Sequence, residues 1–513
     1  MSILVTIYVL TALILAVYGV NAWILTAVYT KHRRDVTPAP STAARSQLPP
    51  VTVQLPIFNE ALVIERLINS VVQLDYPAHL LQIQILDDST DETTDLAQTL
   101  VDVYRWQGFN IELIHRADRP GFKAGALKNG LLTATGELIA IFDADFVPNP
   151  DFLTLTVPYF ADQPQLGLIQ TRWGHLNRDY SWLTLAQGLA LDGHFAIEQT
   201  ARNRSGLLMN FNGTAGVWRR SCIESAGGWQ GDTISEDFDL SYRAQFAGWD
   251  CLFLRDVAAP AEIPPQLAAF KRQQFRWAKG SIQCFKKLGW QVVRSDFSWW
   301  VKYQALVHLS SYLAHPLMVI LALVTPLLMM GAGTDNVRFP LIYLSLVSLG
   351  PPVLYAVAQA SLYPGRWRRH YKAIPLLILL GSGIALNNSK AVLEALLGVG
   401  NVFRRTPKFN IHTHADRWQD SVYRLPVDGL VFGELALALY SLLGAVIALL
   451  NGHIFAVPFI LLYVLGFGYV GGQGLWDARH EWRRWLIGPP SPPRPPTEQS
   501  RTQRRGEALS AER

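Results

Sequence analysis

The sequence predicts an α/β domain with a Rossmann-like sheet, joined to an α-helical transmembrane region. Strand and helix patterns alternate over about a hundred residues after residue 50, which favours a largely parallel sheet. Half of the 513 residues are apolar and the mean hydropathy is +0.15. This composition is too apolar for an ordinary soluble enzyme and too polar for a pure membrane bundle. Apolar segments long enough to cross a bilayer lie at the beginning and in the last third of the chain.

The order of these segments divides the chain into consecutive parts. The long apolar run Ile3–Tyr29 is followed at once by basic residues, so residues 1–30 are expected to form a retained anchor with the next domain in the cytosol. Residues 31–50 form a Pro/Ser/Ala linker and residues 51–262 a cytosolic domain. Amphipathic helices at the membrane surface follow over 263–298, then a membrane region over 299–475 and a disordered cytosolic tail over 476–513.

Four further spans are expected in the membrane region, at Val301–Met330, Phe339–Leu362, Gly429–Leu450 and Ile454–Val470. The apolar segment 371–398 carries Asn387, Asn388, Lys390 and Glu394, and we interpret it as an interfacial helix. If this segment crossed the membrane, the basic residues of 401–408 would lie on the outer side and the basic stretch Arg366–Arg369 on the inner side. Basic loops normally lie on the inner side, which argues against such a span. Trp299 and Trp300 are expected in the interfacial belt, although they are also candidates to line a polar path.

The charge pattern indicates membrane lipids, and no nucleic acid, as the partner of the basic residues. The formal charge is +5, and the basic residues cluster beside apolar segments. These clusters are Lys31–Arg34, Arg366–Arg369, Arg404–Arg405 and Arg479–Arg484. The three cysteines show no metal-binding or disulfide spacing, which is typical of reduced thiols in a cytosolic domain.

Five strands and four helices are predicted within residues 51–262. The strands are Val51–Leu55, Ile83–Leu86, Ile111–His115, Leu138–Phe142 and Leu166–Thr171; the helices are Glu60–Leu74, Gly121–Leu132, Tyr180–Thr200 and Ser235–Trp249. The stretch Asn210–Arg219 is rich in turn residues, with two glycines that allow backbone to approach a ligand closely. The dinucleotide fingerprint G-x-G-x-x-G is absent, which argues against a nicotinamide or flavin enzyme.

Two carboxylates, Asp143 and Asp145, follow the strand Leu138–Phe142 directly. Such a strand end opens onto the crevice where α/β sheets bind ligands. Two hard oxygen ligands there suit Mg²⁺ or Mn²⁺ bridging a diphosphate. An isolated Asp-x-Asp is more often a turn or a helix cap, so its meaning depends on the other motifs.

Further polar groups are placed to act with this pair, each with a structural alternative. Asp87 and Asp88 end a strand, where Asp88 or the following serine could simply cap a helix. Lys123 lies in a glycine-rich helix entry that suits an anion. Glu236 and Asp237 occupy the first turn of a helix, where plain capping is the alternative.

The motif Gln273-x-x-Arg276-Trp277 lies on a basic, aromatic helix. Trp277 offers a flat platform on which a sugar ring can stack, and an interfacial tryptophan is the alternative.

Taken together and in this order, the motifs resemble the D, DxD, ED, QxxRW pattern of processive family 2 glycosyltransferases. The likeness is strongest to the cellulose synthase-like A and C proteins, which are glucomannan 4-β-mannosyltransferases and β-glucan synthases. The stretches that carry it are Val53–Glu60, Gln84–Asp91, Lys123–Leu127, Ile139–Phe146, Phe211–Trp218 and Gln273–Trp277. The resemblance covers nearly the whole chain.

The resemblance implies a GT-A fold, a nucleotide-sugar donor, a divalent cation and an inverting mechanism. By position, Asp87 or Asp88 would contact the nucleoside, and Pro56, Asn59 and Glu60 would line the base and ribose. Asp143 and Asp145 would hold the metal and donor diphosphate, with Asp237 as the general base. Gln273, Arg276 and Trp277, with Lys123, would bind the diphosphate and the acceptor sugar, while Glu236 would lie on the acceptor side.

The stretch 401–410 contains Phe403-x-x-Thr406-x-Lys408, which resembles the gating-loop motif of cellulose synthases. The sequence departs from the bacterial pattern at Arg405, at Ser235 in place of Thr, and at Phe146 in place of His. These departures point away from a standard bacterial cellulose synthase.

Two enzymatic functions follow from the resemblance. The first is a membrane synthase that extends a β-linked glucan, mannan or glucomannan, with export of the product. The second is a glycolipid synthase that adds one or few hexoses to diacylglycerol or a similar lipid. The residues do not separate UDP-glucose from GDP-mannose as the donor. A non-catalytic scaffold is a third hypothesis, against which the intact set of aspartates argues.

Overall fold

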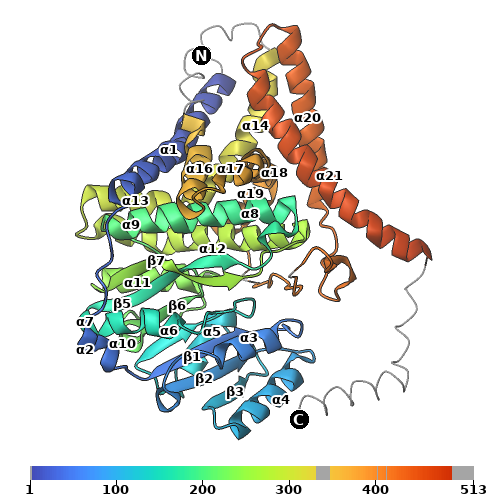
Figure 1. Cartoon of the computed structure of the whole chain (residues 1–513). Helices are drawn as coiled ribbons and strands as arrows, with labels where there is room; N and C mark the ends of the chain where they lie inside the picture. The colour runs from blue at the N-terminus through green and yellow to red at the C-terminus, as the bar shows by residue number, and fades with distance from the viewer. Residues whose placement is uncertain (1–2, 331–346, 401, 412, 488–513) are drawn as a thin grey trace.

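The computed structural model describes residues 3–330, 347–400, 402–411 and 413–487, and the side chains of residues 480–487 lie outside this description. Figure 1 shows an α/β unit at one end of the molecule, a layer of nearly parallel helices across the middle, and a group of long apolar helices at the other end. This arrangement confirms the predicted combination of a Rossmann-like unit with several long apolar helices.

A seven-stranded sheet forms the centre of the α/β unit, with strand order β3-β2-β1-β4-β6-β5-β7. The strands are β1 (Val51–Ile57), β2 (Leu81–Asp87), β3 (Ile111–His115), β4 (Leu138–Ile141), β5 (Leu166–His175), β6 (Gly216–Arg219) and β7 (Asp250–Ala261). β1, β2, β3 and β4 pair in parallel, as predicted. β6 pairs antiparallel to both β4 and β5, so the sheet is mixed rather than largely parallel. β6 and β7 were not predicted, because β6 has four residues within a turn-rich stretch and β7 lacks a regular alternation of apolar residues.

Short helices connect the strands. They are α2 (Thr42–Ser46), within the predicted linker, α3 (Ile64–Val71), α4 (Thr93–Trp106), α5 (Phe122–Gly130), α6 (Phe152–Thr156), α7 (Pro158–Asp162), α10 (Arg220–Ser225) and α11 (Glu236–Phe246), with 3₁₀ turns at Ala78–Leu80 (η1) and Arg178–Tyr180 (η2). The helix predicted over Tyr180–Thr200 is instead α8 (Trp182–Asp192), a π-helical segment η3 (Gly193–Gln199) and α9 (Thr200–Arg204). A π-helical turn is rare and is often found at functional sites.

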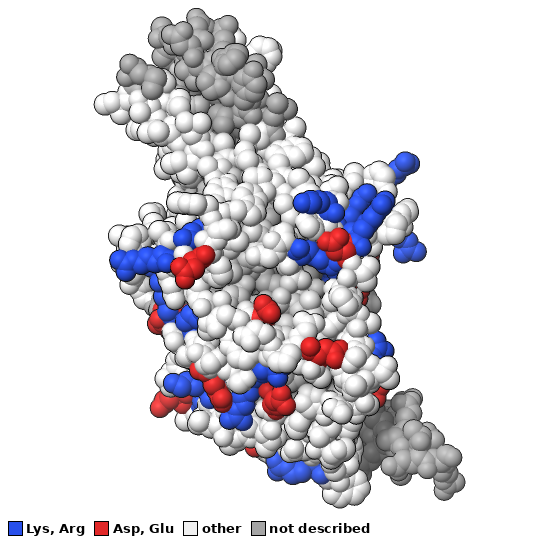
Figure 2. Space-filling view, turned by 90° about the vertical axis from the view of Figure 1, so that its left-hand side faces the viewer, with Lys and Arg blue, Asp and Glu red and all other residues white. Residues whose placement is uncertain are grey.

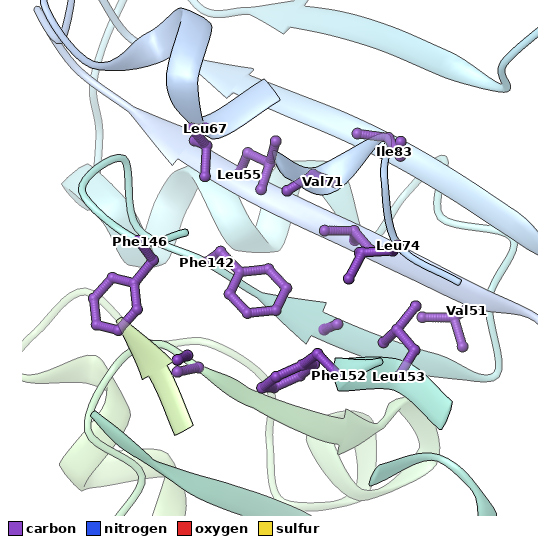
Figure 3. Packing of buried hydrophobic residues seen from close by; sticks show 14 of the residues in the cluster. Val51, Leu55, Leu67, Val71, Leu74, Ile83, Phe142, Phe146, Phe152 and Leu153 are labelled. Carbon is purple, nitrogen blue, oxygen red and sulfur yellow. The ribbon is translucent and has the colours of Figure 1, made fainter. Parts of the chain in front are cut away.

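The main hydrophobic core lies between β1, β2, β4 and the helices α3 and α6 (Figure 3). The rings of Phe142 and Phe152 meet edge to face, with centroids 4.9 Å apart. Val53, Leu55 and Phe142 are completely buried. Full burial of such side chains stabilises a fold by about 1.5–3 kcal/mol each. This packing fixes the strand ends from which the carboxylates Asp87 and Asp143 project.

The middle layer contains α8 and the 28-residue helix α12 (Leu267–Arg294), which replaces the several amphipathic helices predicted over 263–298. Two lysines tie α12 to the apolar helices. Lys271 Nζ lies 2.6 Å from Glu434 Oε1, and Lys279 Nζ lies 2.9 Å from Glu394 Oε2. On α8, Asp192 accepts hydrogen bonds from His175 and from Gln359 of the apolar helices, at 3.0 and 2.9 Å.

A hydrophobic cluster continues this connection across the two parts of the molecule. Leu183 and Leu189 of α8 and Phe270 of α12 share it with Leu377 and Leu380 of the apolar helices. The α/β unit and the apolar helices therefore bury one another's surfaces.

The apolar helices are α1 (Ile3–His32), α13 (Trp299–Leu309), α14 (Ala314–Met330), α16 (Gly350–Leu362), α18 (Ile374–Gly383), α19 (Ala385–Leu397), α20 (Leu430–Leu450) and α21 (Val457–Ile487). Between them lie the short basic helix α17 (Trp367–His370) and the 3₁₀ turns η4 (Ser311–Leu313), η6 (Tyr371–Ala373) and η7 (Trp418–Asp420). Among the described residues, four helices are long and apolar enough to cross a membrane, or five if one bent pair counts as a span. Figure 2 shows Lys, Arg, Asp and Glu gathered on the middle and lower parts of the face in view, while the white surface above them is almost free of these residues.

The segment boundaries differ from the predicted ones at three places. The expected span Val301–Met330 is interrupted at Ser310, so that α13 and α14 are separate helices. The segment 371–398 consists of α18 and α19, and the bend before α19 is 43°. The tail predicted to be disordered from residue 476 is helical up to Ile487, because α21 continues past its apolar part. Part of the expected span Phe339–Leu362 lies outside the described residues.

Candidate functional site

A narrow cleft opens at the carboxyl ends of β1, β2 and β4, where the sheet topology brings the predicted acidic residues together. The segment 402–411 covers one side of it. The space that it leaves for water-sized molecules is about 80 Å³, which is small beside the volume of typical ligand pockets. The lining residues are Pro56, Ile57, Phe58, Glu60, Asp88, Arg119, Lys123, Ala126, Asp143, Ala144, Asp145, Arg276, Phe403, Arg405, Thr406 and Lys408.

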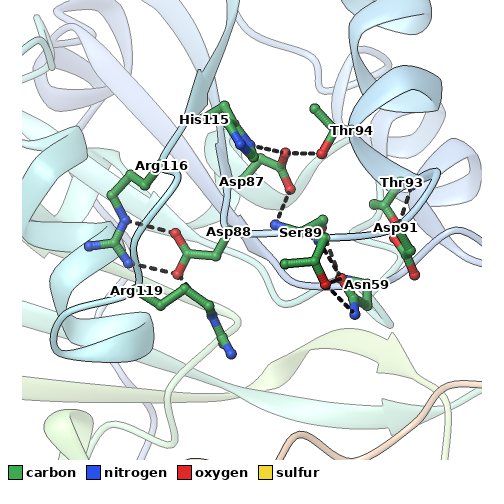
Figure 4. Close-up of polar contacts among 11 residues, drawn as sticks. Asn59, Asp87, Asp88, Ser89, Asp91, Thr93, Thr94, His115, Arg116 and Arg119 are labelled. Carbon is green, nitrogen blue, oxygen red and sulfur yellow. Dashed lines mark hydrogen bonds and ion pairs between the residues drawn. The ribbon is translucent and has the colours of Figure 1, made fainter.

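Of the two neighbouring aspartates at the end of β2, only Asp88 lines the cleft, and Figure 4 shows the different polar partners of the two side chains. Asp87 is fully buried, and its carboxylate accepts hydrogen bonds from Ser89 N and Thr94 Oγ1 and contacts His115 Nδ1 at 2.7 Å. Asp87 therefore shapes the turn after β2. Asp88 forms a two-pronged pair with Arg116, with N···O distances of 2.7 and 2.6 Å. Bidentate arginine pairing holds a carboxylate in a fixed orientation.

Arg119, which sequence reasoning did not select, and Phe58, which lies within the predicted nucleoside-binding stretch, complete this end of the cleft. The Arg119 guanidinium lies 3.3 Å from the centre of the Phe58 ring and 3.6 Å from Asp88 Oδ2. Asn59, with a positive φ of 53°, donates its backbone N–H to Ser89 Oγ and accepts from Thr90 N. Asn59 thus joins the ends of β1 and β2, but it is not among the lining residues.

At the end of β4, Asp143 is paired with Lys123 of α5. Lys123 Nζ donates to Asp143 Oδ1 at 2.5 Å and to the Gly213 carbonyl at 2.8 Å. Burial alone would lower the pKa of Lys123, but the adjacent Asp143 carboxylate raises the pKa above its usual value. Lys123 is therefore a fixed positive charge beside the Asp-x-Asp motif.

Asp145 is nearly buried and meets Lys408 of the covering segment. Lys408 Nζ lies 2.6 Å from Asp145 Oδ2, while Asp145 Oδ1 is buried and has no hydrogen-bond partner among the described residues. A buried carboxylate oxygen without a hydrogen-bond partner is costly, and it is suited to bind a cation. Among the described residues, no three His, Cys, Asp or Glu side chains gather as a metal cluster. The two aspartates thus suit Mg²⁺ or Mn²⁺ that takes its other ligands from phosphate and water.

Asp237 lies beside these groups, at the start of α11. A Cβ atom added to Gly213 would fall 2.9 Å from Asp237 Oδ2 and 3.4 Å from Lys123 Nζ, so the carboxylate and the ammonium flank the same glycine. Burial raises the pKa values of both Glu236 and Asp237, and the charge of Lys123 opposes this. A buried carboxylate with a raised pKa is suited to accept a proton.

The helix α12 brings Arg276 to the same place. Gly280 of α12 packs so closely on the start of α11 that an added Cβ would fall 1.9 Å from Ser235 Oγ. The Arg276 guanidinium lies 4.8 Å from the centre of the Phe403 ring, which stacks in turn on Phe122. Gln273 and Trp277 are partly exposed and are not among the lining residues, so the structure does not place them in the cleft.

The segment 402–411 is held across the cleft at several points. Arg405 donates to Glu60 at 2.9 Å and lies 4.3 Å from the Tyr423 ring centre. Burial raises the pKa of Glu60 to about 8, although the charges of Arg405 and Lys408 act in the opposite direction. Thr406 is buried in the cleft wall.

Glu262, which follows β7, anchors the end of this segment. It accepts the backbone N–H groups of Phe409 and Asn410 at 2.8 and 2.9 Å. Sequence reasoning missed Glu262, because a single glutamate after an unpredicted strand gives no pattern. It noted Arg405 as a departure but not as the partner of Glu60.

The fold and the sequence both have counterparts among known proteins. The fold matches the GT-A structure of "Mannosyltransferase PcManGT from Pyrobaculum calidifontis in complex with GDP-Man and Mn2+", with a TM-score of 0.52 and 21% identity over 76% of this chain and 99% of that one. A family model described as glycosyltransferase-like family 2 matches residues 49–280.

Plant proteins provide the sequence relatives. The probable glucomannan 4-beta-mannosyltransferase 2 of Oryza sativa subsp. japonica is 32% identical over 454 residues, which are 83% of this chain and 75% of that protein. Glucomannan 4-beta-mannosyltransferase 2 of Arabidopsis thaliana is 42% identical over 255 residues, 49% of this chain and 48% of that protein. This match, like that to the rice enzyme numbered 7, spans about half of the relative's length. The chain belongs to glycosyltransferase family 2 and is related to the plant glucomannan 4-β-mannosyltransferases.

Proposed function

We propose that this protein is an inverting hexosyltransferase that moves mannose or glucose from a nucleotide sugar onto a growing β-linked polysaccharide at the membrane. GDP-mannose is the favoured donor, because the plant relatives are named as mannosyltransferases. The observation that supports this most directly is the shared cleft. Asp88, the Asp-x-Asp pair and Arg276 come from distant parts of the chain and line it together, with Asp237 beside them.

The residues at the Asp88 end would recognise the nucleoside of the donor. Asp88 is held by Arg116, so its carboxylate can accept hydrogen bonds from ribose hydroxyls without moving. Phe58, with Arg119 stacked on one face, offers an aromatic surface for the base. Pro56 and Glu60 form the adjoining wall.

The transfer itself requires a deprotonated acceptor hydroxyl and a stabilised diphosphate. Asp237 would take the hydroxyl proton, a step for which a positioned base contributes about 10²–10⁴-fold. Lys123 and Arg276 would neutralise the charge that develops on the diphosphate. Attack on the face of the sugar opposite the departing diphosphate gives inversion of configuration.

Asp143 and Asp145 would hold a divalent cation, which supplies further charge neutralisation at the diphosphate when it is bound. Lys408 would have to leave Asp145 for this, and it can then contact phosphate instead. Gln273 and Trp277 are proposed to contact the acceptor from α12 once the segment 402–411 has moved.

We also propose that the α/β unit is cytosolic and that the long apolar helices cross the membrane. A cytosolic position gives the cleft access to nucleotide sugars, and the basic residues Lys31–Arg34 after α1 favour the same side. The bundle of apolar helices that packs on the α/β unit favours polysaccharide export over glycolipid synthesis, because a hydroxylated polymer cannot cross hydrocarbon unaided.

The test uses the full chain in membranes, supplied separately with radiolabelled GDP-mannose and UDP-glucose and with Mn²⁺ or Mg²⁺. We expect an insoluble product from one donor that β-mannanase or β-glucanase degrades and that lipid solvents do not extract. Asp237→Asn should abolish its formation, whereas Asp102→Asn on the exposed face of α4 should not. A solvent-extractable product would instead establish a glycolipid synthase, and no consumption of either donor would refute the proposal.

A further inference from the structure

A short basic segment joins the apolar helices α16 and α18, close above the layer that contains α8 (Figure 1). This segment, residues 363–373, includes α17 and η6 and is called the basic connector below. Its exposed cationic side chains are Arg366, Arg368, Arg369 and Lys372. Residues 347–393 contain no Asp or Glu, and none of these four cations pairs with a carboxylate in the part of the chain that the structure describes. The basic connector therefore concentrates positive charge that the protein itself does not neutralise.

Two other basic clusters of the sequence are partly neutralised by neighbouring carboxylates. In the cluster after α1, His32 contacts Asp35 at 2.7 Å. In the segment that covers the cleft, Arg405 donates to Glu60 at 2.9 Å. The sequence assigned all basic clusters to lipids alike, whereas these contacts distinguish the basic connector from the other two.

Two aromatic side chains lie among the cations of the basic connector. The partly exposed rings of Trp367 and Tyr371 lie 4.6 Å apart, and the Arg368 guanidinium lies 5.2 Å from the centre of the Trp367 ring. Tryptophan and tyrosine are enriched at the level of lipid headgroups, because one part of the ring is apolar and the other is polar. Aromatic and cationic groups thus share one short helix at the end of an apolar one.

The backbone of the basic connector is held in a defined shape. The N–H groups of Arg366 and Trp367 both donate to the Tyr363 carbonyl, at 3.0 and 3.1 Å, and Gly365 between them has a φ of +87°. The Tyr371 hydroxyl donates to the Ala356 carbonyl of α16 at 2.9 Å. Because the backbone is already ordered, little further ordering is needed when the cations bind a ligand.

The inner side of the basic connector is attached to the α/β unit. His370 Nδ1 lies 2.9 Å from Gln359 Oε1 of α16. Arg178 of η2 donates to the same oxygen at 2.6 Å and lies 4.5 Å from the centre of the Tyr363 ring. Arg178 also pairs with the buried Asp192 of α8 at 3.1 Å. One layer of side chains therefore separates the exposed cations from the helices on which the sheet rests.

From these observations we infer that the basic connector binds the phosphate groups of anionic lipids and thereby fixes the α/β unit at the membrane surface. The inference goes beyond sugar transfer and rests on the proposed membrane position of the apolar helices. Guanidinium groups bind phosphate oxygens through parallel N–H donors, and those of Arg366 and Arg369 have no carboxylate to release first. The apolar helices on both sides and the two interfacial aromatic rings favour a lipid over a soluble phosphate.

Replacing two of the cations should weaken this binding by a predictable factor. One basic residue near an anionic surface strengthens binding about fivefold, so Arg366→Gln/Arg369→Gln should lower the affinity for an anionic lipid about 25-fold. Neither side chain has a hydrogen bond or ion pair among the described residues, so the unfolding midpoint without anionic lipid should not change. Arg45→Gln/Lys128→Gln is the matched control. It also removes two exposed cations, but from α2 and α5 of the α/β unit, and should leave the affinity unchanged.

The experiment titrates the full chain in neutral detergent with fluorescent phosphatidylglycerol, and separately with fluorescent phosphatidylcholine. We expect tighter binding of phosphatidylglycerol, and a loss of this preference only in Arg366→Gln/Arg369→Gln. Equal binding of the two lipids, or equal losses in both double variants, would overturn the inference. Displacement of phosphatidylglycerol by glycerol 3-phosphate at equal concentration would also overturn it, because the site would then take a soluble phosphate. If the unmodified chain did not float with phosphatidylcholine vesicles, the proposed membrane position itself would fail.

Discussion

Replacing Gly213 by alanine should separate backbone strain from damage to the catalytic geometry. Gly213 has a φ of +83°, and an added Cβ would fall 2.9 Å from Asp237 Oδ2, closer than such atoms normally approach. Left-handed backbone costs a residue with a Cβ about 1–2 kcal/mol. In addition, the Asp237 carboxylate has to shift, and a displacement of about 1 Å can lower a rate about 100-fold.

Gly206 provides the matched control. Its φ is +68°, but nothing lies within 4 Å of an added Cβ, so Gly206→Ala introduces similar strain without touching the site. Both variants should lose a similar amount of stability, measured by thermal unfolding in detergent. Only Gly213→Ala should lose sugar transfer, by about 100-fold when donor consumption is measured at saturating donor. Equal transfer rates in the two variants would refute the placement of Asp237 beside Gly213 as the base.

Three further outcomes follow from the contacts in the cleft. Lys408→Ala removes the ammonium group from Asp145, so the protein without donor should bind Mn²⁺ about fivefold more tightly or better in a calorimetric titration; unchanged affinity would contradict the competition between Lys408 and the metal. Glu60→Gln should remove a pH dependence of stability. The pKa of Glu60 is raised to about 8, so between about pH 5 and pH 8 the folded state retains a proton that the unfolded chain has lost. The unfolding midpoint of the unmodified protein should therefore fall, relative to that of the variant, as pH rises over this range. Parallel midpoints over this range would argue against a buried, protonated Glu60. Since burial raises the pKa of Asp237, the transfer rate, measured as donor consumption over a series of buffers, should increase as pH rises and this carboxyl loses its proton, whereas Asp237→Asn should abolish transfer at every pH.

The strands β1 to β4 and the acidic residues that follow them were largely predicted from the sequence, because each buried parallel strand there ends in polar residues. Asp88, Asp143 and Asp145 follow such strands, and the structure brings them together as expected. Asp87 was the alternative to Asp88 for contacting the nucleoside, but its side chain is buried and bonded to polar groups of the turn after β2 and of β3. Adjacent residues of a strand point to opposite sides, and the sequence does not say which side faces the ligand.

The parts that escaped prediction depend on contacts between distant segments. The pair of Arg405 with Glu60 joins residues 345 positions apart, and no local pattern links them. The antiparallel β6 and the π-helical turn η3 were missed for another reason. Each is short and interrupts a longer pattern, so the surrounding packing rather than local preference decides its conformation.

The hydrophobic cluster that Leu183, Leu189 and Phe270 share with Leu377 and Leu380 has a practical consequence. A fragment ending before residue 299 would carry the whole sheet, but it would present these leucines and the phenylalanine to water. Such a patch promotes self-association of soluble chains. Swapping donor specificity between relatives by exchanging the α/β unit alone would meet the same obstacle, so a working chimaera has to exchange α8 and α12 together with the helices that cover them.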